Sequence, residues 1–259
     1  MKATALAVMG MGAGLIAATT SAAAAPENKL PTYLDVPVHA TAQDSCAPGT
    51  LWQGGGNPAT TFQRKRDEDA GIELAIKGVV RQGADIRSTY VDEDGLVHIE
   101  VPTGAQPGVP NRAAWYFTYS YDVALDPSNP TLDKYDAELW IDFDASEKTD
   151  YLKLKLAKLG PPPAAVPCPE PDKNGYGWKA GSTIVIGDDE GTDRVTQNSQ
   201  NLAFYASEID SNPNVKGIQP YTFGPGQFDV VMKIRQKGKG GPIVLHVVFD
   251  VVSAPTQTP

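Results

Sequence analysis

The chain has 259 residues, with 22 lysine and arginine side chains against 31 aspartate and glutamate side chains, and its net charge is −9. A surface with this charge repels nucleic acids and anionic membranes, which disfavours both as partners. The length is sufficient to bury one large core or two small ones.

The first 24 residues have the pattern of a secretory signal peptide. Lys2 precedes an uncharged stretch that runs to Ala25, and Ala22 and Ala24 provide small residues at the spacing that signal peptidases recognise. The alternative, an N-terminal membrane anchor, needs about 20 strongly apolar residues, and Gly, Thr and Ser dilute the apolar part here. We therefore predict cleavage after Ala24, secretion to the extracellular space or the periplasm, and no membrane insertion of the mature chain.

Cys46 and Cys168 are the two cysteines of the chain. An even count in an exported protein favours a disulfide bond between them. The alternative to the disulfide is two free thiols. A metal site built from two isolated cysteines without a nearby histidine is disfavoured. The sequence thus predicts that a disulfide ties Cys168 to the N-terminal part.

Hydrophobic residues recur at every second position rather than with helical spacing, which predicts β-strands. Such alternation occurs at residues 72–77, 138–144 and 152–156, and we expect one buried and one solvated face in each. Turn signals lie between the alternating runs, for example at residues 92–95 and 126–130. Short strands separated by turns predict an all-β fold, an antiparallel β-sandwich of the Ig-like or jelly-roll-like kind.

Two further segments predict core strands. An aromatic stripe at residues 115–121 fits core packing, with a sugar-stacking platform as the alternative. Two alternating runs joined by the glycine-rich residues 236–242 predict a β-hairpin. The side chains expected to point inward are Phe228, Val230, Ile234, Leu245, Val247 and Phe249. Val231, Val244 and Val248 make the second face apolar, so either both faces are covered or the hairpin pairs with another molecule.

Proline marks the division of the mature chain. Residues 161–175 form a Pro-rich connection that we expect to be extended and stiff, between an N-terminal β-rich part at residues 25–160 and a C-terminal β-rich part at residues 176–253. Residues 254–259 are expected to be a flexible tail. The two parts form either one sandwich or two subdomains, and the expected disulfide favours one compact unit.

Histidines and carboxylates are the candidate catalytic groups. His98 and His246 each interrupt an apolar alternation, so we place both on exposed strand faces rather than in the role of a base. Glu138, Asp142 and Asp144 lie on one face of a predicted strand, as the paired acids of glycosidases do. Because aspartate is a short proton donor whose pKa is less easily raised, catalysis there is the alternative hypothesis.

Calcium is the cofactor that the acidic loops suggest. Flexible loops carry oxygen ligands, and the candidate calcium ligands are Asp92, Asp94, Asp188, Asp189 and Asp193. Neither loop has EF-hand spacing, and a solvated acidic turn is the interpretation favoured over a metal site.

Several segments point to a known group of proteins. Residues 62–67, 71–77, 110–115, 135–144, 197–202 and 212–217 follow one another in a pattern that resembles secreted bacterial β-rich proteins of the PEP-CTERM-sorted type. The resemblance implies a surface or matrix location and no enzymatic activity to transfer. The sorting tail itself is not found after Val252, so free release is expected.

These observations support two functional hypotheses. The first is a secreted binding or matrix protein associated with the cell surface, whose partner is an extracellular polysaccharide or a surface protein. The second is a carbohydrate-active enzyme that uses the carboxylates near Asp142. An enzyme requires its acids in a concave groove, whereas a matrix protein presents them on a flat or convex face.

Overall fold

Short extended segments make up nearly all of the regular structure. The computed structural model describes residues 32–33, 62–80, 88–158, 178–180, 184–185, 194–205 and 221–253. The first eight strands are β1 (Thr32–Tyr33), β2 (Gln63–Asp67), β3 (Ile72–Val80), β4 (Ser88–Val91), β5 (Val97–Pro102), β6 (Ala105–Gln106), β7 (Val109–Ala113) and β8 (Trp115–Asp122). The others are β9 (Tyr135–Asp142), β10 (Tyr151–Lys158), β11 (Trp178–Ala180), β12 (Ile184–Val185), β13 (Val195–Gln200), β14 (Gly226–Gln236) and β15 (Ile243–Val252).

Helical structure in the described segments is limited to two 3₁₀ turns, η2 (Leu132–Lys134) and η3 (Leu202–Tyr205). No helix among the described residues is long and apolar enough to cross a membrane.

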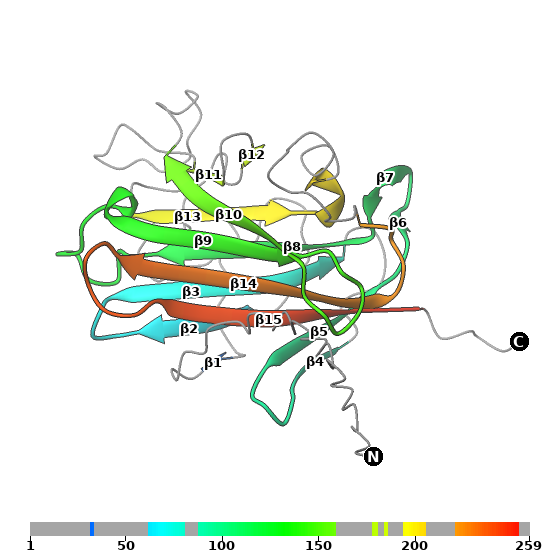
Figure 1. Ribbon diagram of the computed structural model, residues 1–259, viewed down its shortest axis with the longest axis horizontal. Coiled ribbons are helices and arrows are strands. Elements are labelled where there is room, and N and C mark those ends of the chain that lie inside the picture. The colour runs from blue at the N-terminus through cyan, green and yellow to red at the C-terminus, as the bar shows by residue number, and fades with distance from the viewer. Residues whose placement is uncertain are drawn as a thin grey trace, which may run out of the picture.

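The strands form two layers that face each other (Figure 1). One sheet has five strands in the order β1-β2-β3-β8-β13, and the other has eight in the order β12-β11-β10-β9-β14-β15-β5-β4. Strands β6 and β7 form a separate pair. Among the described strands the pairings are antiparallel except that β15 runs parallel to β5. The predicted all-β sandwich is therefore confirmed, with one sheet mixed rather than purely antiparallel.

Aromatic side chains fill much of the space between the sheets. The aromatic side chains on the inner face of β8 are fully buried, as the core interpretation predicted. They are Trp115, Phe117, Tyr119 and Tyr121. Trp115 packs against Phe249 of the opposite sheet, with ring centroids 4.8 Å apart and planes at 21°. The aromatic side chains of β8 thus pack the five-stranded sheet against the eight-stranded one.

The predicted hairpin is the centre of the larger sheet. Strand β14 pairs with β15 and with β9, while β15 also pairs with β5. Every side chain that was expected to point inward belongs to the core, which confirms the predicted register. Val231, Val244 and Val248 are buried as well, so these apolar side chains on the second face of the hairpin are also shielded from solvent.

Strands from before and after the Pro-rich connection share both sheets. Strand β13 pairs with β8 in the smaller sheet, and β14 pairs with β9 in the larger one. The N-terminal and C-terminal β-rich parts thus contribute to the same pair of layers.

The alternation of β3 predicted one solvated face, and this expectation is wrong. All nine residues of β3 are buried. Glu73 accepts hydrogen bonds from Arg64 and Arg66 on β2, at 3.2 and 2.8 Å. Lys77 is fully buried above the Phe62 ring, and its burial lowers the pKa of the ammonium to about 8. A polar residue in a strand is therefore no proof of solvent on that side.

Candidate functional site

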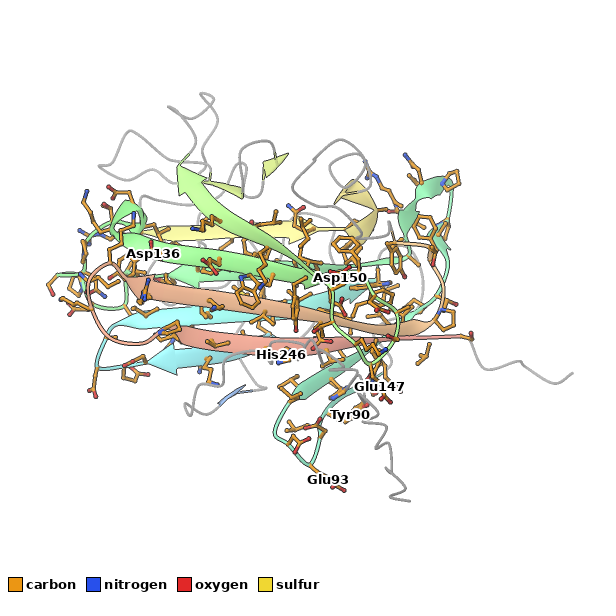
Figure 2. All side chains as sticks on the ribbon, in the orientation of Figure 1. Tyr90, Glu93, Asp136, Glu147, Asp150 and His246 are labelled. Carbon is orange, nitrogen blue, oxygen red and sulfur yellow. The ribbon has the colours of Figure 1, made fainter. Side chains whose placement is uncertain are left out.

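The outer face of the eight-stranded sheet gathers polar and aromatic side chains. Strands β10, β9, β14 and β15 lie side by side there (Figure 1). Because alternate side chains of a strand point to opposite faces, the even-numbered residues of β9 and the odd-numbered residues of β10 and β14 share this face. Figure 2 shows the side chains on the ribbon, with Asp136 and His246 labelled on these strands.

Trp140 lies at the centre of a cluster on this face. Its Nε1–H donates to Glu138 Oε2 at 2.9 Å, and its ring centroid is 5.6 Å from that of Tyr151. Lys153 Nζ and Lys233 Nζ lie 4.1 and 4.0 Å from the Trp140 ring centroid. We call these five residues together with Lys155 the Trp140 patch.

Strand register brings the members of the Trp140 patch together. Trp140 is opposite Lys153 on β10, and Glu138 is opposite both Lys155 on β10 and Lys233 on β14. Trp140 and Tyr151 are partly exposed, while Lys153 and Lys155 are exposed. The patch therefore offers an aromatic surface and charged groups to a ligand.

Positive charge exceeds negative charge in the patch. The patch contains three lysines and one glutamate, and the Lys233 Nζ to Glu138 Oε2 distance is 3.9 Å. Burial lowers the pKa of Lys233, Glu138 opposes this effect, and the charges of Lys153 and Arg235 lower the pKa further. Arg235 itself pairs with Asp136 at 2.9 Å.

Asp142 organises the loop between β9 and β10. Its Oδ1 accepts hydrogen bonds from the backbone amides of Asp144 and Asp150, at 3.0 and 2.7 Å. Its Oδ2 is buried and has no hydrogen-bond partner in the part of the chain that the structure describes. Burial raises the pKa of Asp142 to about 6, assisted by the charges of Asp229 and Asp144 and opposed by the two amides.

Asp229 is the functional candidate that the sequence did not indicate. It lies on β14 directly before Val230, which pairs with Ile141 of β9, and its charge raises the pKa of Asp142. Asp229 Oδ1 contacts His246 Nε2, so this histidine lies partly buried beside a carboxylate. Burial is the main cause of the raised pKa of Tyr151, and the charges of Asp229 and Asp142 raise this pKa further.

The three acids proposed as catalytic do not converge. Glu138 and Asp142 share a face of β9, but four residues of strand separate them by about 13 Å. Carboxyl groups of glycosidases are about 5–9.5 Å apart. Asp144 lies beyond the strand end, where its Oδ1 accepts the amide of Ser146 at 2.9 Å. Among the three, Glu138 alone belongs to the Trp140 patch.

His98 was expected on an exposed face, and this expectation is wrong. The ring is buried, stacked on Tyr90 with centroids 4.8 Å apart. Its Nδ1 lies 2.8 Å from Asp250 Oδ2, and its Nε2 lies 3.2 Å from Asp92 Oδ2. Tyr90 also donates to Asp250 at 2.9 Å. Polar partners on β15 and in the turn between β4 and β5 explain why a histidine is accommodated there.

The turn between β4 and β5 contains the first acidic loop considered for calcium. Asp92 Oδ1 accepts the amides of Asp94 and Leu96, at 3.0 and 2.8 Å. Within the described residues no group of three potential ligands lies close enough to hold a metal ion. Asp92 is thus engaged in forming the turn, while Asp188, Asp189 and Asp193 lie outside the described residues.

A cavity of about 700 Å³ lies at one end of the sandwich. The turn after β2, the loop after β8 and the β14–β15 turn line it. Asn129 Nδ2 donates to the carbonyls of Ala70 and Gly71, and Asp126 Oδ1 accepts the amide of Ser128. Several polar groups in the lining therefore hold the turns together, and no residue of the Trp140 patch lines the cavity.

Some predicted features lie outside the described residues. These are the signal peptide at residues 1–24, the pair Cys46 and Cys168, the Pro-rich connection and the tail. Comparisons with protein-family models, curated proteins and solved structures find no match to this chain. The function is therefore inferred from the residues of the site.

Proposed function

We propose that the protein is an extracytoplasmic binding or matrix protein that holds a polysaccharide on the Trp140 patch. The observation that carries this proposal is the side-by-side placement of Trp140 and Tyr151 on an outer sheet face, surrounded by charged side chains. Aromatic rings supply contact area for the apolar faces of sugars, and adjacent polar groups bind their hydroxyls. Trp and Tyr are also the residues that contribute most often to binding hot spots.

The sequence supports the location of this function. The signal peptide expected at residues 1–24 would direct the chain out of the cytoplasm. The resemblance to secreted proteins of the PEP-CTERM-sorted type suggests a surface or matrix setting, in which polysaccharide is an abundant partner.

The burial and hydrogen bonding of Asp142 and Glu138 favour binding over catalysis. Asp142 has the raised pKa that suits a proton donor, but its carboxyl group is fully buried and bonded to the loop. Glu138 accepts a hydrogen bond from the indole N–H of Trp140. A carboxylic acid that donates a proton to a sugar must reach the glycosidic oxygen, and a buried Asp142 does not.

Trp140→Ala tests the proposal. Because the change removes the central ring, the affinity for a bound polysaccharide is expected to fall about tenfold or more. Isothermal titration of the wild-type protein against a panel of soluble neutral and acidic polysaccharides provides the measurement.

Tyr90→Ala is the matched control, since Tyr90 is another aromatic residue of the same sheet and is 43% exposed. It is expected to retain wild-type affinity. The proposal fails if the wild-type protein binds no polysaccharide, or if Trp140→Ala and Tyr90→Ala bind equally.

A further inference from the structure

The Trp140 patch has a surplus of cations in a chain whose net charge is −9. Lys155 and Lys233 lie opposite Glu138, which is the one carboxylate of the patch, and Lys153 lies opposite Trp140. Neither Lys153 nor Lys155 forms an ion pair within the described part of the chain. Two of the three ammonium groups therefore have no carboxylate partner among the described residues.

The surplus has a physical cost that a ligand can relieve. The Lys233 side chain is only 17% exposed, and the neighbouring charge of Lys153 makes its protonated form less favourable. Glu138 Oε2 serves both this lysine and the indole of Trp140. A bound anion would reduce the repulsion between the ammonium groups, whereas an uncharged ligand would remove water from them without compensation.

We infer that the polysaccharide bound by the Trp140 patch is an acidic one, a polymer of sugars that carry carboxylates. This inference rests on the proposed function and specifies its ligand. The carboxylates pair with Lys153, Lys155 and Lys233 while a sugar ring lies against Trp140. Lys153 and Lys155 are about 7 Å apart along β10, and Lys155 and Lys233 are about 10 Å apart across β9, so a polymer with regularly repeated carboxylates can engage more than one of them.

The surroundings of the patch disfavour a nucleic acid as the polyanion. Asp136 and Asp142 flank the patch along β9, and Asp229 lies on the neighbouring strand. A long, uniformly charged strand would pass these carboxylates and the acidic surface beyond them. A polysaccharide binds through both its rings and its carboxylates, and it places less charge along the same length.

Titrations with polygalacturonate, neutral dextran and duplex DNA, each at low and at high salt, test the inference. We expect binding of polygalacturonate that weakens with added salt, because screening reduces attraction between exposed charges. The double variant Lys153→Gln, Lys155→Gln is expected to bind polygalacturonate at least tenfold more weakly. The charge-matched control Lys134→Gln, Lys239→Gln changes exposed lysines outside the patch and is expected to bind as the wild type does.

The possible results distinguish a wrong choice of ligand from a wrong proposed function. Equal binding of dextran and polygalacturonate that is lost in Trp140→Ala overturns the acidic ligand but leaves the polysaccharide function in place. If the protein binds neither dextran nor polygalacturonate, both the acidic ligand and the polysaccharide-binding function are wrong. Binding of DNA as strong as binding of polygalacturonate, or equal losses in the two double variants, shows a general attraction for polyanions and also overturns the inference.

Discussion

Replacing Trp115 by alanine is expected to destabilise the protein by about 3–5 kcal/mol, the usual range for truncating a fully buried Trp. Trp115 stacks on Phe249, meets Tyr221 edge-on with centroids 6.1 Å apart, and donates its Nε1–H to Tyr221 Oη at 3.0 Å. The change opens a cavity between the two sheets and leaves the buried Tyr221 hydroxyl without its donor. Equilibrium urea unfolding measures the loss.

Two comparisons give this prediction its specificity. Trp115→Phe keeps a ring but removes the N–H, so it should cost clearly less than Trp115→Ala. Trp140→Ala changes a partly exposed Trp and should stay within about 1 kcal/mol of the wild type. A loss below about 1 kcal/mol for Trp115→Ala would contradict the packing of the sheets across this residue.

The second large effect is expected to have the opposite sign: Asp142→Asn should stabilise the protein at neutral pH. The folded-state pKa of about 6 lies above the ordinary value of 3.8, so folding favours the protonated carboxyl. This contribution to stability is complete below about pH 4 and is lost as the pH rises through about 6. The difference corresponds to at most about 3 kcal/mol at pH 7.

Asparagine keeps an oxygen for the amides of Asp144 and Asp150 and carries no charge at any pH. Urea unfolding between pH 4 and pH 8 should show a weaker pH dependence for the variant than for the wild type, and a higher free energy of unfolding at pH 7. Lower stability of Asp142→Asn at every pH would show that the loop requires the ionised carboxylate.

Asp144→Asn is the control for the stabilisation that is expected of Asp142→Asn at pH 7. The amide and hydroxyl of Ser146 lower the pKa of Asp144, so its contribution is present at neutral pH and is lost in acid. The control variant should therefore gain nothing at pH 7.

Single-strand patterns predicted the core well. Apolar alternation places side chains on one side of a strand whatever its neighbours are, which is why the inward residues of β14 and β15 and the aromatic stripe of β8 were assigned correctly. The turn between β14 and β15 was equally clear, because Gly238 and Gly240 have positive φ angles of 78° and 29°, which favour glycine.

The outer faces were less predictable. Glu73 and Lys77 look like solvated residues in sequence, yet both are buried. His98 is also buried, because Asp250 and Asp92 provide its polar partners. Alternation reports that two faces of a strand differ, and it carries no information about what covers the second face.

The site depends on register between strands distant in sequence. Glu138 was one of the candidate acids and Trp140 lies between it and Asp142 in the sequence, but Lys153 and Lys233 approach them only because β10 and β14 pair with β9. The charge of Asp229 acts on Asp142 for the same reason. The sequence of a single strand shows the acids along β9 but not the charges that the neighbouring strands place beside them.

Chemical labelling of lysines tests the central claim most directly. The protein is acetylated with and without polygalacturonate, and mass spectrometry gives the extent of modification at each lysine. The Trp140 patch as the binding surface predicts protection of Lys153, Lys155 and Lys233, with Lys134 and Lys239 modified as before. Protection of Lys134 and Lys239 to the same extent as the patch lysines, or of none of the five, would contradict it.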